Sequence, residues 1–197
     1  MAEYRLTPPL TEAQVRALRV GDTVTLDGAV FGIRDATLIR IFDEEQAPPV
    51  DLRGGVCLHT APNVKKAGGR YEPLSVGTTT SMRMDRFTGG LLERYGVRAV
   101  IGKGGLSGES LKQFERHGGV YLAITGGAAA LETTQIEAIE AVWWEDLMPE
   151  CLWQFRVRGL GPLMVAMDSH GGNLYADVKA EARRRLEEIL TRLEKRA

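Results

Sequence analysis

The sequence predicts a single α/β domain with a mixed sheet and flanking helices. Strand-like and helix-like segments alternate through the middle of the chain, which is typical of a sheet covered by helices. Apolar residues make up 44% of the 197 residues, enough for one buried core. The 23 glycines cluster where the predicted strands end. We expect an N-terminal hairpin layer at about residues 20–50, an α/β core at about 50–175 and a C-terminal helix at 176–197.

The N-terminal part of the chain predicts a short helix, a β-hairpin and a second helix. Thr11 stands three residues before Gln14, which is a capping-box pattern at the start of the first helix. Asp27 and Gly28 separate two alternating apolar runs in "TVTLDGAVFGI", a typical signal of a tight hairpin. Asp35 begins the second helix, in "DATLIRIFDEE".

The middle of the chain predicts strands that run into glycine-containing turns. Residues 56–61, "VCLHTA", form a short buried strand, and a loop with Gly and Pro covers residues 62–77. A helix in "MDRFTGGLLERYG" precedes the strand and turn of "RAVIGKGG". The helix of "SGESLKQFERHGG" ends at Gly118. Since ligands of α/β folds usually bind at the carboxyl ends of strands, these turns are candidate site positions.

The last third of the chain predicts four strands and one long helix. The strands are "VYLAIT", "IEAIEAVWW", "LWQFRVRG" and "LMVAMDSHGG". The helix is charged and amphipathic, and its apolar stripe consists of Leu186, Ile189, Leu190 and Leu193. A solvated face is the ordinary explanation for its basic run at residues 183–185, and contact with a partner is the alternative.

Composition and charge narrow the class of partner. The 25 basic and 26 acidic residues give a formal net charge of -1, whereas a sequence-blind nucleic-acid binder carries a basic surplus. No apolar run approaches the roughly 20 residues of a membrane span. The N-terminal "MAEYRLTPPLTEAQ" lacks the apolar core of a signal peptide, so we expect a cytoplasmic protein that binds neither nucleic acid nor membrane.

The cysteines and histidines predict no metal site in this chain. Cys57 and Cys151 are interpreted as reduced, mostly buried thiols. Two cysteines cannot supply the three or four thiolates that an iron–sulfur cluster takes. His59, His117 and His170 are scattered and form no ligand pair at helical spacing.

Three loops carry cations and hydroxyl groups that favour an anion-binding site. They are "FGIRDAT" with Arg34, "GTTTSMRMD" with Arg83, and "IGKGGLS" with Lys103. Arginine offers a planar two-donor fork and lysine a point charge, so a carboxylate or a phosphate is the expected ligand. Each loop taken alone has an ordinary structural explanation, and no P-loop motif is present.

Five stretches resemble one family: "GDTVTLDGAVFGIRDAT", "PPVDLRGGVCLHTAPN", "VGTTTSMRMDRFTGGLLERYGVRAVIGKGGLS", "HGGVYLAITGGAAAL" and "VWWEDLMPECLWQFRVRGLGPLMVAMDSHGGNLY". Together they span roughly residues 20–175. The chain resembles the beta subunit, or C-terminal domain, of class I fumarate hydratases and L(+)-tartrate dehydratases. The T-T-S-x-R-M-D and I-G-K-G motifs are the most specific part of the match.

The resemblance implies a swivelling β/β/α domain that acts as half of a hydro-lyase. The partner would be an alpha subunit that carries a [4Fe–4S] cluster on three cysteines, in a heterodimer or heterotetramer. The active site would form between the two subunits. The reaction would be the reversible addition of water to a small dicarboxylate, such as fumarate to malate.

The resemblance also implies roles for individual residues. Thr79 would be the catalytic base, with Arg83 and Lys103 beside it, and Arg34 would bind a substrate carboxylate. Two adjacent cations would favour the deprotonated form of a threonine hydroxyl, which is otherwise a very weak acid. One helical turn separates the reactive threonine from the arginine four residues later, so both face the same side. The remaining hydroxyls would cap the following helix or bind a carboxylate; they are Thr78, Thr80 and Ser81.

Two departures from the family pattern keep other functions open. Leu38 stands where the family has a histidine after the R-D pair, and "TAPN" replaces a G-P pair. His59 or His170 could compensate for the lost histidine. The alternatives are an L(+)-tartrate dehydratase beta subunit, a non-catalytic binding or assembly subunit with the same fold, and a stand-alone anion-binding domain.

Overall fold

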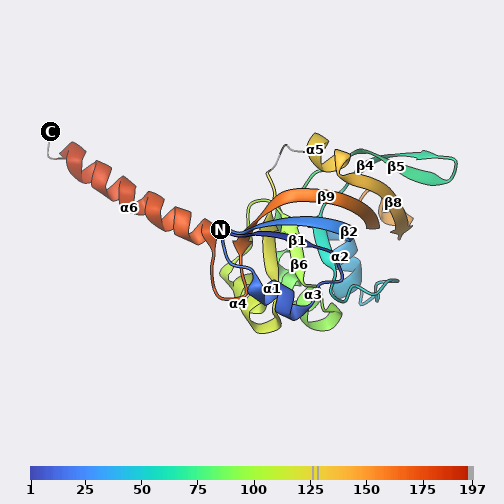
Figure 1. The fold of residues 1–197 in the computed structure, drawn as a ribbon, viewed down its shortest axis with the longest axis horizontal. Coiled ribbons are helices and arrows are strands. Elements are labelled where there is room, and N and C mark those ends of the chain that lie inside the picture. The colour runs from blue at the N-terminus through green and yellow to red at the C-terminus, as the bar shows by residue number, and fades with distance from the viewer. Residues whose placement is uncertain (126, 128, 195–197) are drawn as a thin grey trace.

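The computed structural model describes residues 1–125, 127 and 129–194, and it has the α/β class that the sequence predicts. Figure 1 shows the arrangement of its elements. The strands are β1 (Glu3–Leu6), β2 (Thr23–Ile33), β3 (Val56–His59), β4 (Asn63–Ala67), β5 (Arg70–Ser75), β6 (Ala99–Gly102), β7 (Val120–Ala123), β8 (Ile136–Trp143) and β9 (Leu152–Met167). The α-helices are α1 (Glu12–Ala17), α2 (Asp35–Phe42), α3 (Thr88–Tyr95), α4 (Gly108–His117), α5 (Ala129–Thr134) and α6 (Leu174–Glu194). Two 3₁₀ helices are η1 (Ser81–Phe87) and η2 (Glu145–Leu147).

Seven strands form one mixed sheet in the order β1-β2-β3-β6-β7-β9-β8. The neighbours from β1 to β7 in this order are parallel, whereas β9 runs antiparallel to β2, β7 and β8. The additional pairing of β2 with β9 closes the sheet on itself. Strands β4 and β5 form a separate ribbon.

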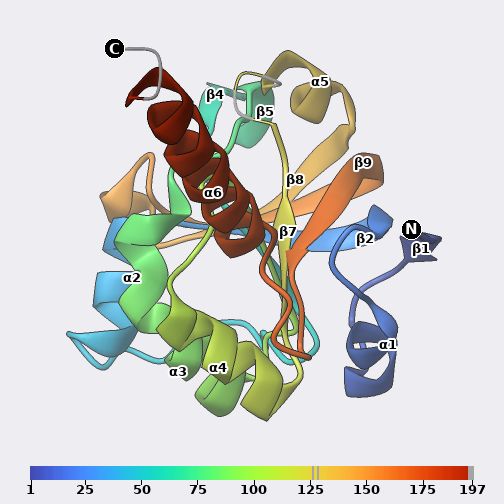
Figure 2. The ribbon, with the colours of Figure 1, turned by 90° about the vertical axis from the view of Figure 1, so that its left-hand side faces the viewer.

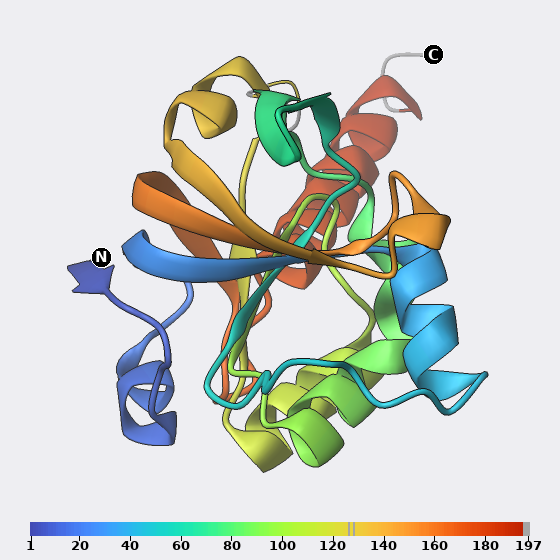
Figure 3. The same cartoon turned by 90° about the vertical axis from the view of Figure 1, so that its right-hand side faces the viewer.

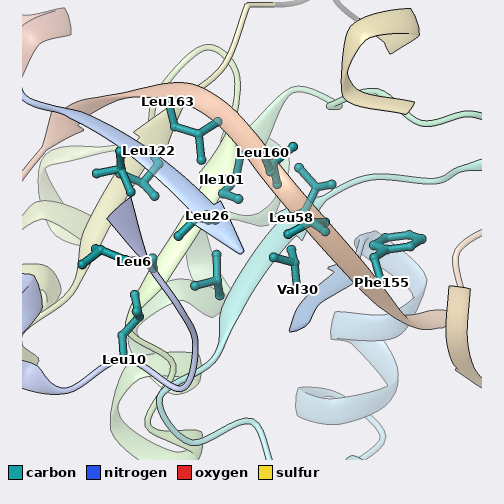
Figure 4. Close-up of a cluster of buried hydrophobic side chains, with 14 of the residues drawn as sticks. Leu6, Leu10, Leu26, Val30, Leu58, Ile101, Leu122, Phe155, Leu160 and Leu163 are labelled. Atoms are coloured by element: carbon teal, nitrogen blue, oxygen red, sulfur yellow. The ribbon is translucent and has the colours of Figure 1, made fainter. Parts of the chain in front are cut away.

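The alternation of side chains in the parallel strands builds three layers. Leu58 of β3, Ile101 of β6 and Leu122 of β7 lie in the buried cluster that β2 and β9 complete (Figure 4). The neighbouring residues in the same strands point to the opposite face. There Cys57 of β3 and Tyr121 of β7 pack into the clusters that include α2, α3 and α4. Figure 2 shows these helices together on one side of the parallel strands. The order is therefore antiparallel strands, parallel strands, helices.

The predicted N-terminal hairpin is wrong. Strand β2 runs straight through Asp27 and Gly28, with β9 antiparallel along its length and irregular pairing beside Leu26. The Asp27 carboxylate accepts hydrogen bonds from Arg5 Nη2 at 2.9 Å and from the Gly159 N–H at 2.9 Å, and Gly28 has a φ of 104°. This Asp-Gly pair therefore forms a bulge in a long strand, because strands β1 and β9 are present on either side to pair with it.

Two further sequence predictions differ from the structure. The segment 62–77 is not a loop throughout, because β4 and β5 form a hairpin around Gly68 and Gly69, both at positive φ. The two predicted strands after residue 151 are one strand, β9. At Gly161 a Cβ atom would lie 2.8 Å from the carbonyl oxygen of Val24, so glycine lets β9 continue while it crosses β2 closely.

The C-terminal helix projects from the body of the molecule (Figure 1). It begins two residues earlier than expected, and residues 195–197 of the predicted helix lie outside the described residues. The predicted stripe is exposed along its length, whereas the first turn of α6 packs on the body through Leu174 and Tyr175. In the described part of the chain, no helix is both long and apolar enough to cross a membrane.

Candidate functional site

Three neighbouring parallel strands bring the candidate residues to one edge of the sheet. Arg34 follows the carboxyl end of β2, His59 ends β3, and Lys103 follows β6. The loop of threonines inserts between β3 and β6: the Thr79 N–H donates to the His59 carbonyl at 2.9 Å, and the Ser81 N–H donates to the Lys103 carbonyl at 3.0 Å. The sheet topology therefore gathers three loops that are far apart in the sequence.

Thr79 and Arg83 are in direct contact. Arg83 Nη2 donates to Thr79 Oγ1 at 3.2 Å and also to Asp35 Oδ2 at 2.9 Å. Thr79 lies two residues before the 3₁₀ helix η1, so the predicted helical turn between it and Arg83 does not form. The extended backbone at Thr80 and the first turn of η1 together bring the two side chains into contact. Asp35 holds the guanidinium in this direction from the first turn of α2. About half of the Arg83 side chain, 49%, is still exposed, so this part of the site is open.

Arg34 is anchored on one side and open on the other. Its Nε lies 3.2 Å from Asp35 Oδ2 and 3.2 Å from Glu150 Oε1. Glu150 also accepts a hydrogen bond from the Ala36 N–H at 2.9 Å, so it ties the start of α2 to the arginine. The terminal nitrogens of Arg34 form no hydrogen bond with any residue that the structure describes. They can therefore bind an added carboxylate.

Lys103 lies in the loop that pairs with the threonine turn. Thr80 and Lys103 form a parallel bridge, and the loop continues through Gly104 and Gly105, both at positive φ. Asp85 of η1 holds the other end of this loop, because its carboxylate accepts from both the N–H and the hydroxyl of Ser107 at 2.7 Å. The Lys103 ammonium has no ion pair with any residue that the structure describes. It is a cation without a fixed counter-ion beside the turn.

The three other hydroxyls of the turn have different surroundings. Ser81 is fully buried, and its Oγ lies 3.0 Å from His59 Nδ1 and 2.9 Å from the Tyr121 hydroxyl. Thr78 is buried, and its hydroxyl lacks a hydrogen-bond partner among the described residues. Thr80 is exposed and occupies the N-cap position of η1 without a side-chain capping bond. The substrate-binding roles of Thr78, Thr80 and Ser81 stay predictions, but Ser81 has a clear packing role.

His59 and Leu38 are both buried, but they differ in their chemical surroundings. Burial lowers the pKa of His59 to about 4, against the opposing effect of Asp35, so its imidazole is neutral near pH 7. Leu38 is fully buried in the cluster of α2, β3 and η1, so this position has a packing role. His170 contacts the Arg16 carbonyl near α1 instead of the threonine turn.

Glu132 is a candidate residue that the sequence reasoning missed. It lies on α5 with only 1% of its surface exposed, and its two carboxylate oxygens have no hydrogen-bond partner among the described residues. Burial raises the pKa of Glu132 to about 7, and the charge of Lys103 partly offsets this rise. Nothing in the residue pattern around "LETTQ" separates this glutamate from a surface one, because its burial depends on where α5 packs.

The described residues do not form a metal site. No three His, Cys, Asp or Glu side chains come together among them. Cys57 and Cys151 are both free and buried, and burial raises the pKa of their thiols to about 12 and about 11. Thiols that resist ionisation are poor metal ligands, since the thiolate is the binding form. The donor set of this chain therefore does not fit an iron–sulfur cluster of its own.

The fold and the site together define an α/β domain with a cation-bearing edge, in which a threonine hydroxyl lies against an arginine at the ends of parallel strands. Comparison with known proteins identifies the family. The chain belongs to the Fumarase C-terminus family, whose model matches residues 2–178. The resemblance inferred from the sequence is confirmed.

Three relatives illustrate the range of the family. The L(+)-tartrate dehydratase subunit beta of Escherichia coli (strain K12) is 39% identical over 175 residues, which are 88% of this chain and 87% of the relative. A Methanocaldococcus jannaschii protein with the same name, given provisionally, is 37% identical and covers 92% of this chain and 95% of the relative. A protein of Geobacillus stearothermophilus, provisionally named a class I fumarate hydratase, is 38% identical over 93% of this chain but only 36% of its own length.

Proposed function

We propose that this chain is the beta subunit of a hydro-lyase that reversibly adds water to the double bond of a small dicarboxylate, such as fumarate to malate. The observation that carries the proposal is the contact of Arg83 with Thr79 Oγ1 beside the Lys103 loop. Family membership and the names of the relatives support the reaction class.

Thr79 is the base of the proposed reaction. In the dehydration direction, its deprotonated Oγ takes a proton from the carbon next to the one that bears the hydroxyl group. The electron pair of that C–H bond forms the double bond. The oxygen keeps the electron pair of the C–O bond and leaves as hydroxide, which takes up a proton to become water. Arg83 and Lys103 stabilise both the alkoxide of Thr79 and the negative charge that develops on the substrate carboxylate. Arg34 holds a substrate carboxylate through its terminal nitrogens.

The proposal assigns the [4Fe–4S] cluster to an alpha subunit, because the cysteines of this chain do not fit it. When bound there, the cluster would supply the Lewis acid toward the departing hydroxyl group. The open edge around Arg83 is where such a subunit would cover the substrate. The name "subunit beta" of two of the relatives supports a two-subunit enzyme.

The decisive experiment is anaerobic affinity purification of this chain from its native lysate, followed by iron analysis and assays with fumarate, malate and L(+)-tartrate. An active iron-containing complex supports the proposal. An iron-containing complex that is inactive with all three substrates would favour a non-catalytic assembly subunit. A chain that purifies alone and without iron would contradict the proposal.

L(+)-tartrate is the second candidate substrate, and one observation favours it. The named tartrate dehydratase relatives match this chain over nearly their whole length, whereas the fumarate hydratase relative is a much longer protein. A ratio of kcat/KM values for L(+)-tartrate and malate, measured on the complex, decides between the two.

A further inference from the structure

Helix α6 presents an apolar stripe that nothing in the described chain covers. Val178, Leu186, Ile189, Leu190 and Leu193 are each between 47% and 60% exposed. Figure 1 shows that most of the helix lies away from the other elements. Helices in proteins gain most of their stability from packing such a face, so an uncovered stripe of this length indicates a docking surface.

Both edges of the stripe are basic. In a helix of roughly 3.6 residues per turn, Arg185 and Arg192 follow one edge of the stripe, and Lys179 and Arg183 follow the other. Glu181 and Glu188 lie on the back of the helix and pair with Arg184, and Glu181 also pairs with Arg185. Lys179 and Arg183 form no ion pair with any residue in the described ranges. The complementary surface has an apolar floor and an acidic rim.

This charge pattern argues against two other occupants. In a pair of α6 helices packed stripe to stripe, parallel or antiparallel, a basic edge would face a basic edge, which disfavours a second copy of this chain. Residues 174–197 carry seven basic and five acidic side chains, a surplus of only two, whereas segments that bind an anionic membrane surface carry clusters of about four to eight basic residues.

The base of α6 lies at the candidate site. The Tyr175 ring packs against Gly105, where an added Cβ would lie 2.7 Å away, and against the Tyr121 ring at 6.3 Å between centroids. Gly105 belongs to the Lys103 loop, and Tyr121 bonds to Ser81 of the threonine turn. The helix thus leaves the body from the same loops that line the open edge of the site, and a subunit that covers that edge is within its reach.

We propose that α6 is a docking arm that inserts its stripe into an apolar, acidic-rimmed groove of the alpha subunit. This inference rests on the proposed two-subunit function. The family model stops matching at residue 178, so the stripe from Leu186 onward extends beyond the part shared across the family. The arm therefore makes docking specific to the alpha subunit of this enzyme.

The test uses the full chain, the purified alpha subunit as the probe, and a sedimentation or surface-binding measurement of Kd. Leu186→Gln with Ile189→Gln removes the stripe, and we expect binding to weaken on the order of 100-fold. Arg183→Gln removes one edge charge, and we expect about a fivefold loss with a smaller dependence of Kd on salt. Thr191→Glu makes the same change in net charge on the back of the helix, and its Kd should stay within about twofold of the wild-type value.

The outcomes separate this inference from the proposed function. If the stripe variant binds the alpha subunit as tightly as wild type and the complex is active, the proposal that α6 is a docking arm is wrong, whereas the proposed hydro-lyase function is supported. If wild type binds no alpha subunit, both fail. Stripe-dependent dimers of the chain alone, or stripe-dependent binding to phosphatidylserine vesicles, would assign α6 to a second copy or to a membrane and overturn the proposal. In every variant, circular dichroism must show an intact helix.

Discussion

Thr79 differs from the other hydroxyls of its turn in what its side chain contacts. Its Oγ1 accepts a hydrogen bond from a guanidinium, whereas the hydroxyl of Ser81 is sealed in the core between His59 and Tyr121. A hydroxyl next to a fixed cation is the one whose deprotonated form is stabilised. At the scale of residues, the contact with Arg83 therefore distinguishes Thr79 from Thr78 and Thr80.

We expect Thr79→Ala to lower kcat of the complex by roughly 10²- to 10⁴-fold, the range of general base catalysis. Folding should change little, because the hydroxyl of Thr79 has no packing role in the described structure. Steady-state assays and thermal melts of the complex measure both effects. Thr79→Ser, which keeps the hydroxyl, is the matched control and should retain more activity than the alanine variant. Equal activity of Thr79→Ala and wild type would rule out Thr79 as the base.

Lys103→Ala should reduce kcat less than Thr79→Ala. The reason is that removing a cation that stabilises the base costs less activity than removing the base itself. Arg83 would still contact Thr79 Oγ1 in that variant. The comparison is made at saturating substrate and at the same iron content. A Lys103→Ala complex with wild-type activity would mean that the lysine loop is structural only.

Glu132→Gln should change stability in a pH-dependent way. The pKa of Glu132 rises from an ordinary 4.5 to about 7 on folding, so the folded state holds its proton more tightly than the unfolded state. The stabilisation from the neutral acid is complete below pH 4.5 and is lost as the pH rises through 7. At about 1.4 kcal/mol per tenfold change in proton affinity, wild type should be up to ~3 kcal/mol less stable than the glutamine variant above pH 7.

Denaturant unfolding of the two proteins at pH 5 and pH 8 tests this expectation. Glu72→Gln, at an exposed position on β5, serves as the control and should show the same difference from wild type at both pH values. A Glu132→Gln effect that does not change with pH would show that the carboxyl group does not titrate in this range.

At the scale of elements, the site depends on how closely η1 packs against β6. A Cβ atom at Gly102 would lie 1.9 Å from Ser81 Oγ and 2.9 Å from the Tyr121 hydroxyl, so only glycine allows this approach. The close contact brings the start of η1 against the end of β6, and with it the threonine turn against the lysine loop. The position of Thr79 is thus set by the packing of two elements beneath it.

Gly102→Ala should destabilise the chain by about 1–3 kcal/mol, the cost of overpacking, and should lower kcat because the turn is displaced. Ser81→Ala removes the clashing oxygen, so the double variant should be more stable than the sum of the two single changes predicts. Chemical denaturation of the four proteins measures this coupling. Strict additivity would mean that the two residues are not in contact.

At the scale of the whole molecule, the candidate site is an open edge and not an enclosed pocket. Arg83 is half exposed, and the helix that leaves from the same loops projects away from the body in Figure 1 and lies behind the body in Figure 3. An enzyme that holds a dicarboxylate by charged side chains needs a cover over such an edge, because bulk solvent weakens those electrostatic contacts. The two-subunit proposal supplies that cover from the partner.

We expect chelation of iron from the complex to abolish hydro-lyase activity without unfolding this chain. The reason is that no metal site forms among its described residues, so its fold gains nothing from the metal. Activity and the thermal melt of this chain, followed before and after chelation under anaerobic conditions, give the two readouts. Loss of the fold together with the iron would place a metal ligand in this chain.

The sequence by itself determined the features that depend on residues close together in the chain, such as helix ends and short motifs. The capping box of Thr11 and Gln14 forms as predicted, and Gly118 ends α4 at positive φ. The family resemblance, from short motifs, is likewise confirmed by the family match. These features need only residues that are close in the chain.

Tertiary structure decided the features that depend on distant partners. The Asp27-Gly28 pair is a bulge and not a turn, because β9 pairs with β2 on both sides of it. Glu132 is buried, and its pKa is raised, because α5, which carries it, packs against β5 and β8. Arg34 reaches the site because parallel strands end at the same edge. The physical reason is the same in each case: pairing and burial are properties of neighbours in space, and residue patterns record only neighbours along the chain.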